Sequence, residues 1–242
     1  MMAASAAIWH DVECGAYEAD LPLWEELADG GGGPVLELGC GTGRVALRLA
    51  RQGHQVIGLD HDRDLLVELV ERAAELPVYP HCADALDFEL DQPVAVVLAP
   101  MQFLQLLSGS EARHRCLRRI AGALRPGGVL AAAVVEAAPP APAEALPPLP
   151  DVREIDGWIY SSLPTAVVAP AAGELALRRL RQTISPEGTL SEETNEIRLH
   201  LVDADELEAE AEAAGFTPVG RRVIPETEVH VGSNVVLLEK VR

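Results

Sequence analysis

Residues 35–44 read Val35-Leu36-Glu37-Leu38-Gly39-Cys40-Gly41-Thr42-Gly43-Arg44, and this stretch decides the fold. A short apolar run ends in an acidic residue, and three glycines then follow at every second position. A loop that turns from a strand into a helix needs backbone angles that side chains obstruct and glycine tolerates. Glycine also lets a ligand lie directly against the main chain. The pattern therefore predicts a strand, a tight ligand-binding loop and a helix.

A second apolar run, 56–59, ends at another carboxylate, Asp60. Glu37 and Asp60 would thus close neighbouring strands at the edge where open α/β sheets bind ligands. Nicotinamide dehydrogenases share this layout, but they aim a helix N-terminus at a pyrophosphate through G-x-G-x-x-G. Arg44 stands here where that fingerprint requires glycine or alanine. The two carboxylates instead suit a ligand that carries a ribose diol and an amino group but no phosphate.

These residues resemble the class I S-adenosylmethionine (SAM)-dependent methyltransferases, in particular those that act on small molecules. Two later segments are similar to the same family: Leu124-Arg125-Pro126-Gly127-Gly128 before an apolar strand, and Ala213-Ala214-Gly215-Phe216 after the last predicted helix. The resemblance covers residues 34–136 and 203–242. It implies SAM as methyl donor and S-adenosyl-L-homocysteine (SAH) as product.

Alternating strands and helices predict an α/β fold, a doubly wound Rossmann-like sheet with right-handed crossovers. The resemblance implies seven strands, a C-terminal reversed β-hairpin, and a small antiparallel β cap inserted after the fifth strand. Three strand-like runs would build the cap, namely 152–161, 174–184 and 193–201. The expected organisation is 1–33, N-terminal lid and helix; 34–136, SAM-binding core; 137–202, linker and substrate cap; 203–242, helix and strands that complete the core.

Carried over by position, the resemblance implies a set of cofactor contacts. The loop residues Gly39, Cys40, Gly41 and Gly43 would line the methionine half, and Glu37 would order the loop and the methionine amine. Asp60 would accept from the ribose hydroxyls, a two-point contact suited to a carboxylate. The remaining contacts would be His61 on the adenine face, Asp84 at the adenine amino group, Ala85 or Leu86 at the ring through the backbone, Ala99 and Met101 near the sulfonium, and Tyr17 as a lid residue.

The sequence says less about the residues that would bind the methyl acceptor. Methyl transfer from a sulfonium depends mainly on holding donor and acceptor in line, and a base is needed only when the acceptor must lose a proton early. The catalytic residue is therefore unknown, and the candidates are Tyr17, His10 and His200, with His230 also able to reach a substrate cavity. Gln102 and Gln105 can face the substrate. Trp158 and Tyr160 form either a substrate wall or the cap's own core.

The net charge of the chain limits the kinds of molecule that it is expected to bind. The formal net charge is −19, whereas an enzyme that grips nucleic acid presents a basic face to the phosphates. The basic clusters at 113–119 and 178–181 fit a solvated helix face and a solvated strand, although Arg179 and Arg181 share a face that an acidic substrate could use. We therefore expect a small-molecule substrate and no nucleic acid.

Four scattered cysteines, without a C-x-x-C pair, indicate reduced thiols in the cytoplasm and no metal site. No apolar run approaches the length of a membrane span, so we expect no membrane partner. The leading hypothesis is a SAM-dependent methyltransferase that acts on a small metabolite by direct displacement. The alternatives are a nicotinamide-dependent oxidoreductase and a catalytically inactive SAM-binding regulatory protein. The sequence leaves open the acceptor atom (nitrogen, oxygen or carbon) and the oligomeric state, monomer or homodimer.

Overall fold

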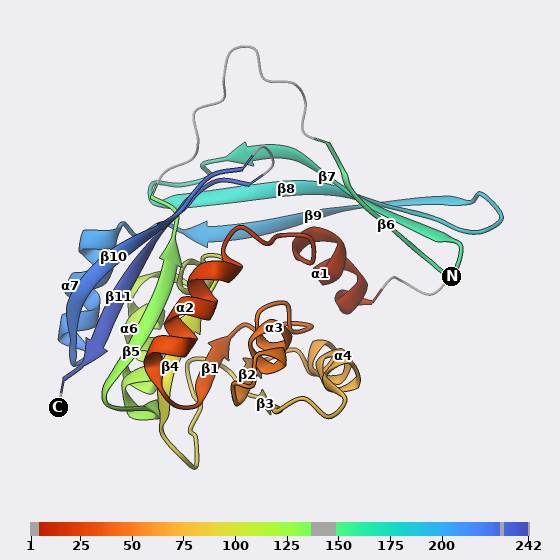
Figure 1. Ribbon diagram of the computed structural model, residues 1–242. Coiled ribbons are helices and arrows are strands. Elements are labelled where there is room, and N and C mark those ends of the chain that lie inside the picture. The colour runs from red at the N-terminus through yellow and green to blue at the C-terminus, as the bar shows by residue number, and fades with distance from the viewer. Residues whose placement is uncertain (1–4, 137–148, 228–229, 242) are drawn as a thin grey trace.

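Two β-sheets organise the chain in the computed structural model, which describes residues 5–136, 149–227 and 230–241 (Figure 1). The main sheet has seven strands in the order β10-β11-β5-β4-β1-β2-β3. Its strands are β1 (Val35–Leu38), β2 (Val56–Asp60), β3 (Val78–Cys82), β4 (Val94–Ala99), β5 (Leu124–Val134), β10 (Phe216–Ile224) and β11 (Ser233–Lys240). β11 runs antiparallel to both of its neighbours, β10 and β5. The predicted seven-stranded sheet with a reversed hairpin is confirmed.

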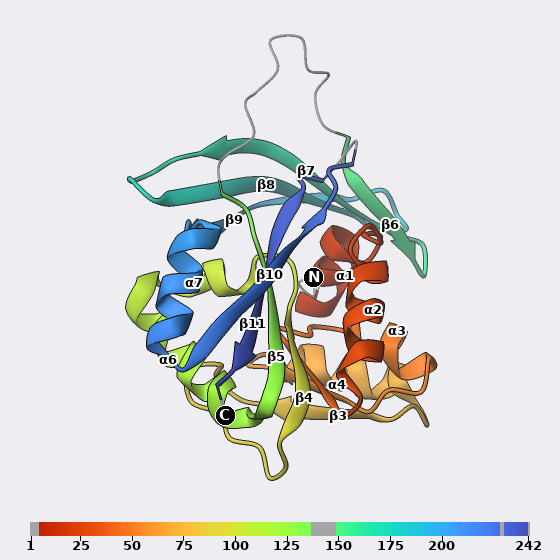
Figure 2. The same cartoon turned by 60° about the vertical axis from the view of Figure 1, so that its left-hand side comes forward.

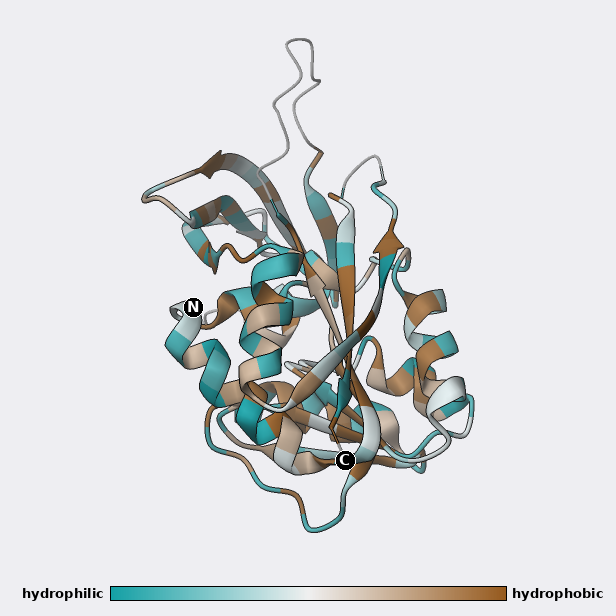
Figure 3. Cartoon of the chain, turned by 90° about the vertical axis from the view of Figure 1, so that its left-hand side faces the viewer, coloured by the Kyte–Doolittle hydropathy of each residue, from teal (hydrophilic) through white to brown (hydrophobic). Residues whose placement is uncertain are grey.

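Helices cover both faces of the main sheet (Figure 2). One face packs against α2 (Leu21–Gly31), α3 (Ala46–Arg51) and α4 (Arg63–Ala73), and the other against α5 (Phe103–Leu106), α6 (Gly109–Ala123) and α7 (Ala204–Ala213). Every residue of β1 and β4 is buried, as expected of parallel strands covered on both sides. Figure 3 shows the resulting hydrophobic layer within the sheet.

The second sheet is the antiparallel cap, and it has one strand more than the sequence predicts. Its strands are β6 (Asp151–Ile155), β7 (Trp158–Val168), β8 (Glu174–Ile184) and β9 (Leu190–His200). The predicted run 152–161 splits at Asp156-Gly157, whose φ angles of 51° and 80° are both positive. Two consecutive positive φ angles build the tight turns that join hairpin strands. The prediction of three strands was therefore wrong, because an Asp-Gly turn signal inside the first run was missed.

Helix boundaries follow local capping chemistry. A capping box opens α7, because Asp203 accepts from the Glu206 N–H and the Glu206 side chain accepts from the Asp203 N–H. Ser108 occupies the N-cap position of α6 without a side-chain bond. The predicted linker at the start of 137–202 falls largely on 137–148, outside the described residues.

α1 (Ala6–Cys14) lies between the cap and the main sheet, against β6 and β7 on one side and α4 on the other (Figure 1). Ser5 caps it by accepting from the Ile8 N–H. The helix therefore covers the carboxyl edge of the parallel strands, where the glycine loop emerges. No helix in the described part of the chain is long and apolar enough to cross a membrane.

Candidate functional site

The loop after β1 requires glycine for two separate reasons. Gly39 and Gly41 have φ angles of 63° and 53°, in the left-handed region. A Cβ atom on Gly39 would lie 2.5 Å from the Phe103 ring, and one on Gly41 would lie 2.2 Å from Nε2 of His10. Both the backbone angles and the close neighbours therefore exclude larger residues.

Asp60 holds this loop in place from the end of β2. One carboxylate oxygen accepts from the Gly41 N–H at 2.9 Å, and the other accepts from the Asp62 N–H at 2.9 Å. The side chain is buried, yet each oxygen has a second lone pair that can accept from a ribose hydroxyl. His61, the next residue, is 87% exposed at its side chain. The predicted roles of both residues towards the cofactor stay predictions.

Glu37 carries an unpaired oxygen in the protein interior. The residue is 3% exposed, and its Oε2 has no hydrogen-bond partner among the described residues. Burial raises the pKa of the Glu37 carboxyl to about 8, despite the Arg44 charge and a hydrogen bond from the Ala46 backbone. An orphaned carboxyl oxygen needs a hydrogen-bond partner, and a cationic donor beside it would favour the ionised form of the group. The α-ammonium group of SAM fits this requirement.

The adenine side of the expected site lies at the end of β3. Asp84 is exposed, and its Oδ1 accepts from the Leu86 N–H at 2.8 Å, so the side chain orders its own turn. The Ala83 N–H donates to the carbonyl of Asp60, which ties this turn to β2. Ala85, between them, is buried. The turn thus lies beside Asp60, as the predicted contacts with one nucleoside require.

A cavity of about 60 Å³ opens next to the end of β4. Ala99 ends the strand in the core, and Met101 and Gln102 then turn the chain with φ angles of 48° and 60°. The lining combines residues from the lid, the β4 turn and the C-terminal hairpin: Tyr17, Asp20, Met101, Gln102, Ala133, Ile224, His230, Val231 and Ser233. The cavity therefore joins the predicted sulfonium wall to segments far away in the sequence.

Tyr17 lines this cavity, and Arg44 connects it to the glycine loop. The Arg44 guanidinium lies 5.2 Å from the Tyr17 ring centroid, and its Nη1 donates to the Tyr17 carbonyl at 2.8 Å. Both terminal nitrogens of Arg44 also donate to Asp20, at 2.6 and 2.7 Å. The sequence indicated Arg44 only as a residue that excludes a dehydrogenase. The structure adds a positive role, the connection of loop and lid.

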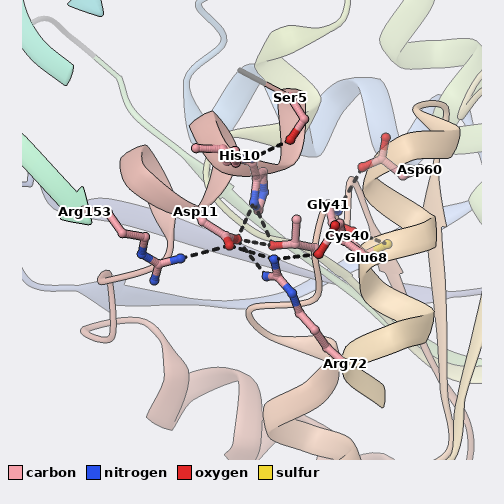
Figure 4. A network of polar contacts seen from close by, with 11 residues as sticks. Ser5, His10, Asp11, Cys40, Gly41, Asp60, Glu68, Arg72 and Arg153 are labelled. Carbon is pink, nitrogen blue, oxygen red and sulfur yellow. Dashed lines mark hydrogen bonds and ion pairs between the residues drawn. The ribbon is translucent and has the colours of Figure 1, made fainter. Parts of the chain in front are cut away.

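Asp11 fastens α1 over the glycine loop (Figure 4). Its carboxylate accepts from Thr42 Oγ1 at 2.7 Å, from Arg72 at 2.9 Å and from Arg153 at 2.9 Å. Burial alone would raise the pKa of Asp11, but hydrogen bonds from His10, Arg72 and Thr42 outweigh it and hold this pKa well below its usual range. The loop, α4 and the cap are thereby joined at one carboxylate.

His10 lies directly over the loop. Its Nδ1 is 3.1 Å from Thr42 Oγ1, and its ring occupies the space beside Gly41. His200, the other histidine candidate, lies on β9 with Nδ1 3.8 Å from Glu174, and it does not line the cavity. The structure therefore brings His10 and Tyr17 to the site and leaves His200 outside it.

The predicted solvation of the basic clusters was wrong for the residues that face α1 or α7. Arg181 donates to both Glu13 oxygens, at 2.7 and 2.9 Å, and Arg179 is buried with its Nε donating to Ser162. Alternation along β8 turns both arginines towards α1. Arg113 is likewise buried, with two bonds to Glu210 at 2.9 and 2.8 Å. Each charge is satisfied internally, so none is free for an acidic substrate.

The aromatic residues of the cap pack against the lid helix. Tyr160 contacts Trp9 edge to face with ring centroids 5.8 Å apart, and Trp158 packs on the same cluster. Of the two roles predicted for Trp158 and Tyr160, this arrangement fits a hydrophobic core and not a substrate wall. The core lies between the cap and α1. Gln102 lines the cavity, with its Nε2 donating to Ser233 at 2.8 Å.

Gln105 requires a correction. The side chain is fully buried, and its amide exchanges two bonds with the Val135 backbone, at 2.8 and 2.9 Å. A further bond reaches the Val202 carbonyl at 3.3 Å. These bonds use both N–H donors of the amide, and burial keeps a substrate away from the remaining lone pair of its oxygen. Gln105 thus joins the end of β5 to the segment before α7, and the prediction that it faces the substrate was wrong.

Replacing Asp11 by asparagine is expected to release α1. The change keeps the shape of the side chain but removes the charge that pairs with Arg72 and Arg153, so we expect a loss of about 2 kcal/mol of unfolding free energy at pH 7. Urea unfolding and hydrogen exchange of residues 6–14 measure it. The difference should shrink below pH 3.8, the ordinary pKa of the group. A lowered pKa stabilises the fold fully above this value and progressively less as the pH falls towards the pKa of the folded protein.

Glu68→Gln is the matched control, because it removes the other acidic partner of Arg72 and leaves Asp11 in place. It should change stability by less than about 0.5 kcal/mol. Equal losses of stability in the two variants would contradict the claim that Asp11 fastens α1 over the glycine loop.

Known proteins resemble this chain mainly in the part that contains the glycine loop, Asp60 and the Asp84 turn. Residues 35–128 match the family model described as a methyltransferase domain. The chain is 34% identical over 97 residues to the cypemycin N-terminal methyltransferase of a Streptomyces species, which covers 40% of each chain. It is 34% identical over 117 residues to a SAM-dependent Diels-Alderase of Talaromyces variabilis, which covers 47% of this chain and 40% of the relative. The matched part thus spans about two fifths of the length of these curated relatives.

The similarity of the whole fold extends further than the sequence similarity. The solved structure of a sugar N-methyltransferase from a Streptoalloteichus species aligns with a TM-score of 0.77 at 18% identity. The alignment covers 100% of this chain and 95% of that one, including the cap. At this identity the likeness bears on the fold alone.

Proposed function

We propose that this chain is a class I SAM-dependent methyltransferase that transfers the methyl group of SAM to a nitrogen atom of a small metabolite. One protein that it resembles is named a sugar N-methyltransferase, and another is named for the methylation of an N-terminus, which carries an amine. A nicotinamide-dependent oxidoreductase finds no support in these comparisons.

The buried, unpaired Oε2 of Glu37 is the observation that carries the proposal. It lies at the end of β1, directly before the glycine loop, where a donor group is missing. The methionine amine of SAM would supply that donor, while Asp60 and the Asp84 turn would hold the nucleoside. No comparable feature of the loop calls for a pyrophosphate, and Arg44 is already bound to Asp20.

When bound, SAM supplies an electrophilic methyl group whose transfer leaves a neutral thioether. The protein's own residues would hold the acceptor in the cavity beside Met101 and would close α1 and Tyr17 over the site. Enclosure excludes water and holds the acceptor in line, which supplies much of the rate in a displacement reaction. We therefore expect no obligatory metal and no covalent intermediate with the protein.

The test is methyl transfer from labelled SAM to a panel of small amines, with amino sugars, amino acids and N-terminal dipeptides as separate arms. We expect label in at least one product and release of an equal amount of SAH, detected by mass spectrometry. Isothermal titration calorimetry should show binding of SAM and SAH but not of NADH. Binding of NADH alone would contradict the proposal.

A second outcome would point to the other kind of relative. The SAM-dependent Diels-Alderase is a relative whose named reaction is not methyl transfer. Tight SAM binding with no SAH formed on any amine, alcohol or carbon acid would favour such a use of the cofactor, or a regulatory protein without activity. Chromatography after incubation measures how much SAM has become SAH. Unchanged SAM would separate both of these cases from methyl transfer, which forms SAH.

The remaining partners follow from the same proposal. A small-molecule substrate suits the enclosed cavity, and the formal charge of −19 disfavours nucleic acid. The four cysteines are free thiols in the structure, which supports a reducing compartment such as the cytoplasm. We also propose that the parts of the chain predicted from the sequence have separate roles. Residues 1–33 and 137–202 would enclose the methyl acceptor, while the core would hold SAM.

A further inference from the structure

We propose that His230 takes the proton from the acceptor amine, with Tyr17 holding its imidazole in place. This inference rests on the proposed methyl transfer to nitrogen and names a residue for the proton. His230 lines the cavity at the end of β4, from the turn that precedes β11. It is thus a wall residue of the chamber that the lid closes.

The position of the imidazole is fixed by stacking. The rings of Tyr17 and His230 have centroids 4.5 Å apart and planes inclined by 29°. The His230 backbone is fixed as well, since its N–H donates to Thr227 Oγ1 and its carbonyl accepts from the Thr227 N–H. Within the part of the chain that the structure describes, neither ring nitrogen of His230 has a hydrogen-bond partner. An oriented imidazole with a free nitrogen is suited to accept a proton.

The other polar walls of the cavity are already engaged. Asp20 accepts from Arg44 and from the Trp24 indole N–H, at 2.8 Å for the latter. Gln102 donates to Ser233, and burial raises the pKa of the Tyr17 hydroxyl, so Tyr17 stays protonated. His230 is therefore the wall group whose lone pair is basic enough to take a proton near neutral pH.

The protonation state agrees with this role. Burial lowers the pKa of His230 below its ordinary value of 6.5. Among the charged groups that face it, Asp151 and Asp20 favour the imidazolium, while Arg179 and Arg44 oppose it. The imidazole is thus neutral at pH 7.5 and becomes charged only on acidification.

The step balances without any further reagent. The acceptor arrives as an ammonium ion and gives one proton to a ring nitrogen of His230. Its freed lone pair forms the nitrogen–carbon bond, and the electron pair of the broken sulfur–carbon bond stays on sulfur. The imidazolium then returns its proton to water, so one proton leaves for each methyl group transferred.

Sinefungin tests this assignment without knowledge of the substrate, because it carries an amine where SAM carries its methyl group. We expect wild-type protein to bind sinefungin more tightly than SAH at pH 8, and we expect this ratio of affinities to fall about tenfold by pH 5, as His230 becomes charged. His230→Asn should lower the ratio at pH 8 and remove most of its pH dependence. His54→Asn, at a histidine bound to Asp29 outside the cavity, should behave like wild type.

Calorimetry at the two pH values gives all four dissociation constants for each protein. His230→Gln serves as a second variant, and a thermal melt checks that each variant is folded. A ratio that keeps its pH dependence in both variants would overturn the role of His230 and leave the methyltransferase proposal intact. Failure of wild-type protein to bind SAH would instead overturn the proposed function itself, and the assignment of His230 with it.

Discussion

Replacing Gly41 with valine abolishes SAM binding in our expectation, with an affinity loss of more than about 100-fold. A β-branched residue is strained at the φ angle of 53° that this position adopts. Its Cβ atom would also lie 2.2 Å from Nε2 of His10 and would push this ring away from the loop, beside which the cofactor is expected to lie. The strained backbone would further disturb the bond from the Gly41 N–H to Asp60. Calorimetry with SAM and SAH measures the loss.

Gly53→Val is the matched control for that experiment. Gly53 also has a positive φ angle, 96°, but an added Cβ atom meets nothing within 4 Å. This variant therefore carries similar backbone strain in the turn before β2, without obstruction of the site. It should lose some stability and keep its affinity for SAM. Unchanged affinity in Gly41→Val would mean that the loop does not bind the cofactor.

Replacing Glu37 with glutamine should stabilise the free protein at pH 8 and weaken SAM binding by more than about tenfold. Burial raises the pKa of this carboxyl from 4.5 to about 8, so the folded protein holds a proton that the unfolded chain releases. Wild-type stability is therefore highest below pH 4.5 with respect to this group, and it falls as the pH rises to about 8. The expected decrease between pH 5 and pH 8 is about 3 kcal/mol.

Urea unfolding at several pH values in this range measures the decrease, and calorimetry measures SAM affinity. Glu37→Gln should remove this part of the pH dependence because the amide does not titrate. Glu212→Gln, on the exposed side of α7, changes a carboxylate in the same way without burial and should leave both quantities unchanged. Loss of stability in Glu37→Gln at pH 8, with unchanged SAM affinity, would refute the orphaned oxygen as a cofactor contact.

The sequence predicts the main sheet well because its strands are short apolar runs separated by strong turn signals. Val94–Ala99 could hardly be anything but a strand buried on both faces, and the structure buries all of it. The cap is harder because its strands are half exposed, and three of them, β6, β8 and β9, are rich in charge. Asp156-Gly157 was read through as strand, although Asp-Gly is a typical hairpin turn.

The candidate site divides in the same way. The glycine loop and its two carboxylates are local in sequence, so their pattern predicts a pocket directly. The pairing of Arg181 with Glu13 joins positions 168 residues apart, and no local pattern reveals which arginines meet a carboxylate. The stacking of His230 on Tyr17 is equally non-local. The resemblance predicted Tyr17 as a lid residue, but no local pattern could show that His230 stacks on it.

This stack has a consequence for the order in which the protein is made. A ribosome that adds 5–20 residues per second completes His230 roughly 10–40 s after the glycine loop. During this interval the growing chain already contains β1, β2 and β4 of the donor half, but the last wall of the acceptor cavity does not yet exist. Under the proposed function, a nascent chain that ends before His230 lacks this wall and should hold an acceptor poorly. We therefore expect turnover only after translation has passed His230.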